Sequence, residues 1–138
     1  MNPNIKKMII AAQVEKLNNV IDFVNAVLEE NNCSMKAQMQ IEVALEELFV
    51  NIAHYAYSDG NGEAEIDVSV DDGYVEITLI DSGIPYNPLA KPDPDVTLSA
   101  NERAIGGLGI FMSKKLMDDI SYEYVDGKNK LTIKKKIN

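Results

Sequence analysis

Apolar residues recur along this chain with two different periods, which separate strands from helices. Segments that alternate apolar and polar residues, or that form a short apolar run, indicate β-strands. Asp-Gly pairs at 72–73 and 126–127 each join two such segments and are typical of tight turns, so they predict two hairpins. The strands are expected over residues 5–12, 64–70, 74–81, 121–125 and 130–137.

Three other segments carry their apolar residues at helical spacing. The first covers residues 14–32, and the second begins after Ser34, a residue type that favours helix N-caps. The second includes EELFVNIAHYAY at 46–57, and the third, residues 106–120, opens with a cluster of glycines. The element order β-α-α-β-β-loop-α-β-β predicts an α+β fold, a two-layer sandwich of a mostly antiparallel sheet with helices on one face.

A long segment without any period separates the first hairpin from the third helix. Residues 84–104 contain four prolines, which exclude regular structure over most of the segment. A loop of this length in a compact domain is typical of a functional lid or of a disordered segment. Residues 1–138 are expected to form a single domain, because this length with 46% hydrophobic residues supports one core and leaves little room for a second.

The composition narrows the classes of partner and compartment. A formal net charge of −9 disfavours binding to a phosphate backbone, so no nucleic acid is expected as the main partner, whereas a basic protein suits this charge. A single cysteine, Cys33, excludes an internal disulfide and a cysteine-based metal cluster. No apolar run approaches the length of a membrane span and no signal-peptide pattern is present, so a cytoplasmic protein without membrane insertion is expected.

Two polar residues interrupt the apolar side of the second helix. Glu47 and Asn51 lie one turn apart, so their side chains are neighbours, and Val43 and Val50 flank them. An ionised carboxylate in such surroundings costs several kcal/mol unless a partner stabilises it. The pair is either a satisfied polar pair at the edge of the apolar stripe or part of a binding site.

A third acidic residue ends the first hairpin. Asp81 is in phase with Val75, Ile77 and Leu79, so its side chain is expected on the same buried face. A carboxylate there can accept a hydrogen bond from an exocyclic amine or from a buried amide; alternatively it starts a turn. Gly83 follows at a point where the backbone must bend or approach a ligand closely.

Glycines at the start of the third helix offer a place for phosphate. Residues 106–109, Gly-Gly-Leu-Gly, leave backbone N–H groups unblocked at the positive end of a helix dipole. Arg103 precedes them and either reaches a phosphate or is an ordinary surface residue. His54 is the only histidine and is interpreted as structural, so a zinc site is not expected.

These features occur in an order that resembles the ATP-binding fold shared by histidine kinases, gyrase, Hsp90 and MutL. The resemblance implies that Asn51 helps to hold Mg²⁺ on the phosphates of ATP, that Asp81 binds the adenine amino group, and that the glycine cluster wraps the phosphates under the lid. The implied nucleotide-binding residues are Asn51, Asp81, Gly83, Arg103, Gly106, Gly107, Leu108 and Gly109.

Finer details resemble one branch of that family, the bacterial anti-sigma-factor serine/threonine kinases. The segment DSGIPYNP, residues 81–88, matches the adenine box of this branch, with Pro85 where histidine kinases carry glycine. Two departures stand out. Tyr55 replaces a histidine found in many relatives, and a threonine pair of the last strand is replaced near Asn129 and Lys130.

The resemblance to this branch implies a mechanism and partners. Glu47 is the implied catalytic base that takes the proton from a substrate serine hydroxyl. The implied partners are a small anti-anti-sigma protein, which is phosphorylated, and a sigma factor, which is sequestered; homodimerisation through the helix-free face of the sheet is implied as well. Two alternatives stay open: a nucleotide-dependent binding module without phosphotransfer, and a detached catalytic domain that phosphorylates a histidine, which the Pro85 box disfavours.

Overall fold

A computed structural model describes residues 5–90 and 107–138 of the chain. The strands are β1 Lys6–Ala11, β2 Glu63–Asp71, β3 Tyr74–Asp81, β4 Asp119–Val125 and β5 Lys128–Lys136. The α-helices are α1 Leu17–Glu30, α2 Met35–Tyr55 and α3 Gly107–Leu116, and two short 3₁₀ turns cover Val14–Lys16 and Pro88–Ala90. The predicted strands and helices are thus confirmed in order and type.

The strands form a single sheet in the order β1-β2-β3-β5-β4, and every neighbouring pair is antiparallel. Both Asp-Gly pairs form the predicted hairpin turns. Asp72 and Gly73 have φ angles of 52° and 80°, and Asp126 and Gly127 have 54° and 76°, the left-handed region that tight hairpins require. Strand β5 lies between β3 and β4, so segments far apart in the sequence meet in the middle of the sheet.

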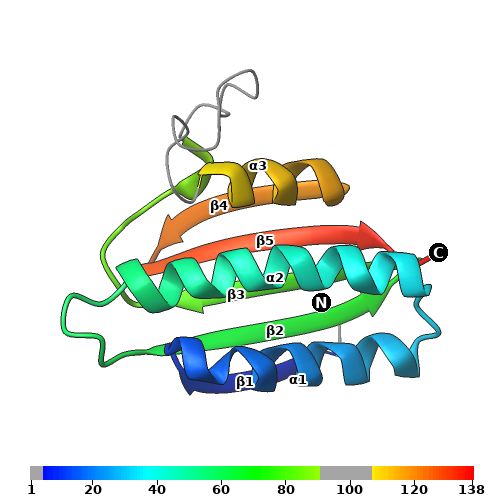
Figure 1. Cartoon of the computed structure of the whole chain (residues 1–138), viewed down its shortest axis with the longest axis horizontal. Coiled ribbons are helices and arrows are strands. Elements are labelled where there is room, and N and C mark those ends of the chain that lie inside the picture. The colour runs from blue at the N-terminus through cyan, green and yellow to red at the C-terminus, as the bar shows by residue number, and fades with distance from the viewer. Residues whose placement is uncertain (1–4, 91–106) are drawn as a thin grey trace.

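The three helices of the described part pack on one face of the sheet, as Figure 1 shows, and this confirms the predicted two-layer α+β sandwich. The core fills the space between the layers. The inward residues of the central strands are almost completely buried: Ala64, Ile66, Val68, Val75, Ile77, Leu79 and Ile133. The helices contribute a matching set: Val20, Val24, Leu28, Ile41, Ala44, Leu45, Leu48 and Phe49.

The ends of α2 and α3 test the predicted helix boundaries. The Ser34 hydroxyl accepts a hydrogen bond from the Ala37 N–H at 3.1 Å, which confirms Ser34 as the N-cap of α2. Helix α3 ends at Leu116, earlier than the predicted limit at residue 120. It ends there because the next residues join the sheet: the Asp118 N–H donates to the Lys134 carbonyl, and the Asp118 carboxylate accepts from the Lys136 N–H.

The predicted lid lies mostly outside the described residues. Residues 84–90 are described and include the turn Pro88–Ala90, whereas the remainder of the predicted lid, residues 91–104, is not. Within residues 5–90 and 107–138, no helix is long and apolar enough to cross a membrane.

Candidate functional site

Asp81 is buried at the end of β3, on the face of the sheet that the helices cover. The residue is 6% exposed, and Val75, Ile77 and Leu79 share its side of the strand, as the alternation predicts. Oδ1 of Asp81 accepts two hydrogen bonds of 2.9 Å, one from the Gly83 N–H and one from the Asn129 side-chain amide. The carboxylate is therefore held by donors at one oxygen.

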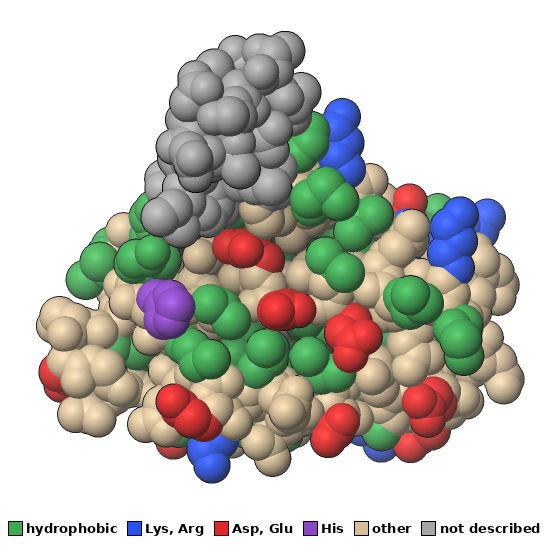
Figure 2. All heavy atoms as spheres, in the orientation of Figure 1, with side chains coloured by type: hydrophobic (Ala, Val, Ile, Leu, Met, Phe, Trp, Pro, Cys, Tyr) green, Lys and Arg blue, Asp and Glu red, His purple; other side chains and the backbone are tan. Residues whose placement is uncertain are grey.

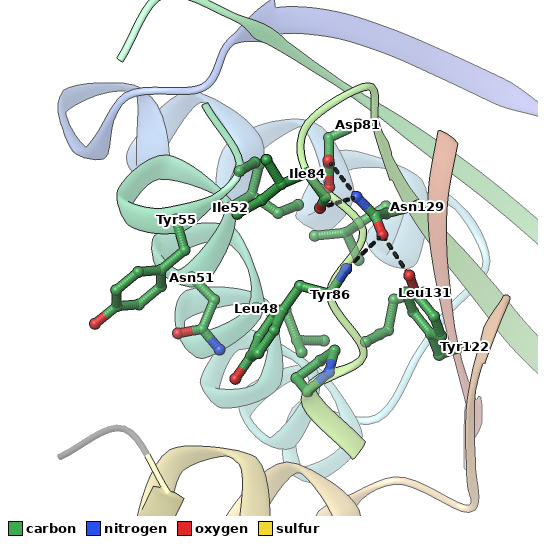
Figure 3. A pocket seen from close by; sticks show the side chains of 13 residues that line it. Leu48, Asn51, Ile52, Tyr55, Asp81, Ile84, Tyr86, Tyr122, Asn129 and Leu131 are labelled. Atoms are coloured by element: carbon green, nitrogen blue, oxygen red, sulfur yellow. Dashed lines mark hydrogen bonds between the residues drawn. The ribbon is translucent and has the colours of Figure 1, made fainter. Parts of the chain in front are cut away.

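A cavity opens between α2 and the end of β3, and Figure 3 shows Asp81 and Asn129 on one side of it and the α2 residues on the other. The space between its walls, counted out into the open mouth, is about 480 Å³. The lining is mostly apolar or aromatic: Leu48, Ile52, Tyr55, Ala56, Leu79, Ile84, Tyr86, Pro88, Tyr122 and Leu131. The remaining lining residues are Asn51, Asp81 and Asn129.

The Glu47–Asn51 pair spans two environments. Asn51 lines the cavity with Asp81, whereas Glu47 is not among the lining residues and packs against the start of α3. Burial raises the pKa of the Glu47 carboxyl, a hydrogen bond with Asn51 opposes this shift, and the nearby charge of Glu46 adds to it. Asn51 therefore interacts with Glu47 on one side and shares the cavity with Asp81 on the other.

Two of the predicted glycines lie where a side chain would collide with neighbouring atoms. A Cβ at Gly109 would lie 1.8 Å from Oε1 of Glu47, so the Glu47 carboxylate occupies the space beside α3 that the side chain of any other residue at position 109 would need. A Cβ at Gly83 would lie 2.1 Å from the carbonyl oxygen of Ala56, which also accepts the Ile84 N–H at 2.9 Å. In this structure the close approach at Gly83 is to the end of α2.

The remaining predicted residues lie at the start of α3, before it, and near the end of α2. Gly107 and Leu108 begin α3, while Arg103 and Gly106 lie outside the described residues. His54 is exposed near the end of α2, where its ring meets that of Tyr55 edge-on. Among the described residues, no group of three or more His, Cys, Asp or Glu side chains is placed to hold a metal ion.

Asn129 is the residue whose role sequence reasoning missed, because it was noted only as a departure from the family pattern. It is 6% exposed and pairs directly with Asp81 across β3 and β5. One signal was available: Asn129 is in phase with Leu131 and Ile133, so a polar side chain occurs at a buried position of the last strand. Tyr122, which also lines the cavity and donates to Asn129, was missed as well.

The lining of the cavity is chemically suited to a mostly apolar ring that carries an amino group. Apolar and aromatic side chains form its walls, and a carboxylate at its end accepts hydrogen bonds. A buried carboxylate favours a ligand that brings an N–H donor, since an unpaired charge in such a site is costly.

Comparison with known proteins assigns this chain to a family. A family model described as the histidine kinase-like ATPase domain matches residues 10–135. The serine-protein kinase RsbW of Bacillus cereus is 29% identical over 98 residues, a match that covers 68% of this chain and 61% of that protein. RsbW of Listeria monocytogenes is 26% identical over 99 residues, covering 68% and 63%. The match thus spans somewhat less than two thirds of the length of these relatives.

Solved structures give the same fold at low sequence identity. The RsbU and RsbW domains of Rv1364c from Mycobacterium tuberculosis match with a TM-score of 0.66 and 17% identity, over 96% of this chain and 32% of that chain. The catalytic domain of the histidine kinase ThkA matches with a TM-score of 0.57 and 15% identity, over 96% and 97%. Because the family model spans β1 to β5 and these structures share the fold, this chain belongs to the family of histidine kinase-like ATPase domains.

Proposed function

We propose that this chain binds ATP, with the adenine ring in the cavity beside Asp81. The observation that carries the proposal is the placement of Asn51 and Asp81 in one mostly apolar cavity of a histidine kinase-like ATPase fold. The Asp81 carboxylate suits adenine as an acceptor, because its Oδ1 already accepts two N–H groups and its Oδ2 has no partner of its own among the described hydrogen bonds. The 6-amino group of adenine is a donor that fits this oxygen.

The phosphates and Mg²⁺ would lie between α2 and α3. Asn51 offers one amide oxygen, the kind of hard ligand that Mg²⁺ prefers, and water and phosphate oxygens complete such sites. Gly107, Leu108 and Gly109 begin α3, where backbone N–H groups favour an anion. Gly106 and Arg103, by resemblance, extend this phosphate-binding set.

The proposed reaction is transfer of the γ-phosphoryl group to a serine or threonine of a protein partner. Mg-ATP supplies the phosphoryl group and the charge neutralisation. Glu47 would take the proton from the substrate hydroxyl, and the raised pKa of its carboxyl makes it a stronger base than an ordinary glutamate. The hydrogen bond from Asn51 would hold the Glu47 carboxylate in position.

The proposed partners are those of a partner-switching kinase, an anti-anti-sigma protein and a sigma factor. The support is the similarity to proteins named serine-protein kinase RsbW. The helix face also suits a protein partner: Met35, Met39 and Val43 of α2 are exposed, and acidic side chains lie among the apolar ones on this face (Figure 2). A cytoplasmic homodimer completes the proposal.

Transfer of radiolabel from ATP to candidate protein substrates tests the proposal. We expect acid-stable phosphoserine or phosphothreonine on an anti-anti-sigma protein of the same organism, and binding of Mg-ATP by the purified chain. Acid-labile phosphohistidine would instead support the detached histidine-phosphorylating alternative. Failure of the wild-type chain to bind ATP at millimolar concentration would refute the proposal as a whole.

A binding module without phosphotransfer is the second candidate, and one observation favours it. The Glu47 carboxylate packs against Gly109 and lies outside the cavity lining, so the described arrangement does not present it toward the nucleotide site. In that case ATP would change the affinity for a protein partner while no label is transferred. The same radiolabel experiment, combined with partner binding in ATP and in ADP, separates the two candidates.

A further inference from the structure

The Asn129 side chain uses its full hydrogen-bonding capacity inside the protein. Its Nδ2 donates to Oδ1 of Asp81 and to the Ile84 carbonyl, both at 2.9 Å. Its Oδ1 accepts from the Tyr86 N–H at 3.1 Å and from the Tyr122 hydroxyl. An amide side chain has two N–H donors and an oxygen with two lone pairs, and all four are occupied here (Figure 3).

This network fixes the orientation of the amide. If the Asn129 amide were rotated by half a turn, its oxygen would face the Asp81 carboxylate and the Ile84 carbonyl, two acceptors, and its nitrogen would face the Tyr86 N–H. Three of the four hydrogen bonds would then fail, and leaving buried polar groups unpaired is costly. Asn129 therefore has one orientation, and it links β3, β4, β5 and the segment that follows Asp81.

The fixed amide in turn fixes the Asp81 carboxylate. Asn129 and the Gly83 N–H both donate to Oδ1 of Asp81, so these two hydrogen bonds fix the orientation of the carboxylate. Oδ2 is then the oxygen left for a molecule in the cavity, and it accepts hydrogen bonds. A 6-amino purine brings an N–H donor to this oxygen, whereas a 6-oxo purine brings another acceptor and is repelled.

We propose that Asn129 is a positioning residue that makes the cavity select a 6-amino over a 6-oxo purine nucleotide, with Tyr122 as its support. The inference rests on the proposed nucleotide binding and deepens it. Asn129 acts through Asp81, and it also anchors Ile84 and Tyr86, which line the cavity. Neither residue was expected to contribute from the sequence.

Asn129→Asp is the sharpest test, because it keeps the shape and the accepting oxygen while it removes the amide that always donates to Asp81. Two buried carboxylates in contact cannot both ionise, so the pair shares one proton; Asp81 carries this proton part of the time and is then no longer held as a pure acceptor. We expect wild-type protein to bind Mg-ATP more tightly than Mg-GTP in calorimetric titrations. In Asn129→Asp the selectivity ratio, the Kd for Mg-GTP divided by the Kd for Mg-ATP, should fall by about 10-fold or more, which corresponds to about 1.4 kcal/mol.

A second variant keeps the test valid should Asn129→Asp fold poorly. Tyr122→Phe removes one hydrogen bond to Asn129 and leaves Asp81 untouched, so the Kd ratio should fall by a smaller factor, about 2- to 5-fold. Tyr124→Phe is the matched control, because Tyr124 is on the same strand but is 46% exposed and does not line the cavity, and the ratio should not change.

The selectivity ratio separates positioning from a merely structural role. If the variants weaken ATP and GTP binding by equal factors, or if Tyr122→Phe behaves as Tyr124→Phe does in a folded protein, the inference is wrong while the proposed function stands. If wild-type protein binds neither nucleotide, the proposed function and the inference fail together. A wild-type preference for ATP that both Asn129→Asp and Tyr122→Phe reduce supports the inference.

Discussion

Alanine substitutions at two glycines of the site should have opposite consequences for stability and function. At Gly83 the added Cβ would lie 2.1 Å from the Ala56 carbonyl oxygen and 2.5 Å from its carbon. Ordinary van der Waals contacts begin near 3.4 Å, so the two backbone segments must separate by about 1.3 Å. That movement breaks the 2.9 Å hydrogen bond from Ile84 to Ala56. Overpacking costs about 1–3 kcal/mol and the hydrogen bond about 1 kcal/mol, which gives a loss of about 2–4 kcal/mol.

At Gly109 the added Cβ meets a movable group. The three nearest atoms all belong to the Glu47 side chain, with Oε1 at 1.8 Å, so the carboxylate can rotate away. Alanine favours a helix over glycine by about 1 kcal/mol, which offsets the cost of the displaced side chain. We therefore expect the free energy of unfolding of Gly109→Ala to change by less than about 1 kcal/mol, while the contact between Glu47 and Asn51 is lost and phosphotransfer falls by about 10-fold or more.

Urea denaturation followed by circular dichroism measures the first effect, and radiolabel transfer measures the second. With a slope of about 2 kcal/mol/M, the midpoint of Gly83→Ala should fall by about 1–2 M and that of Gly109→Ala by less than about 0.5 M. Ser82→Ala, an exposed side chain beside Gly83, is the control and should unfold as wild type does. Equal losses of stability in both glycine variants, or full phosphotransfer by Gly109→Ala, would refute this account.

Three further predictions follow from charged and apolar positions. Glu47→Gln should bind Mg-ATP normally, but its phosphotransfer should fall by about 100-fold, and an active Glu47→Gln would contradict the proposed base. In the wild type the rate should fall on the acid side at a higher pH than an ordinary glutamate would give, because the pKa of Glu47 is raised, and Glu47→Gln should lack this fall. Asn51→Ala should weaken both nucleotide binding and phosphotransfer. Asp67 has a buried oxygen without a hydrogen-bond partner among the described residues, and burial and Glu65 raise its pKa to about 6. The folded state therefore holds the proton of the Asp67 carboxyl more tightly than the unfolded state does, so the stability of the wild type that depends on this proton is present below pH 4 and lost by pH 7. Asp67→Asn has no such proton and should gain stability relative to wild type as the pH rises over that interval. A difference in urea midpoints that stays constant with pH would exclude this. Light scattering should give twice the 15.3 kDa of one chain, and Ile80→Glu on the helix-free face of the sheet should halve that mass, whereas a monomeric wild type would exclude the dimer.

The sequence alone determined the elements of this fold, because strands, helices and hairpins depend on local patterns. The period-2 alternation placed Asp81 on the buried face, and the Asp-Gly pairs set the register of both hairpins through their turns. Ser34 capped α2 as its chemistry predicts. The polar character of Glu47 and Asn51 on the apolar side of α2 marked that helix as unusual before any contact was known.

Tertiary structure decided which side chains meet. Asp81 and Asn129 are 48 residues apart, and they pair only because β5 inserts between β3 and β4, a non-local contact that no turn specifies. Helix packing likewise put Gly109 against Glu47, so that a glycine expected to bind phosphate also makes room for a carboxylate. Local periodicity fixes the face on which a residue lies, but the pairing of distant strands and the packing of helices fix its neighbours, and the candidate site consists of such neighbours.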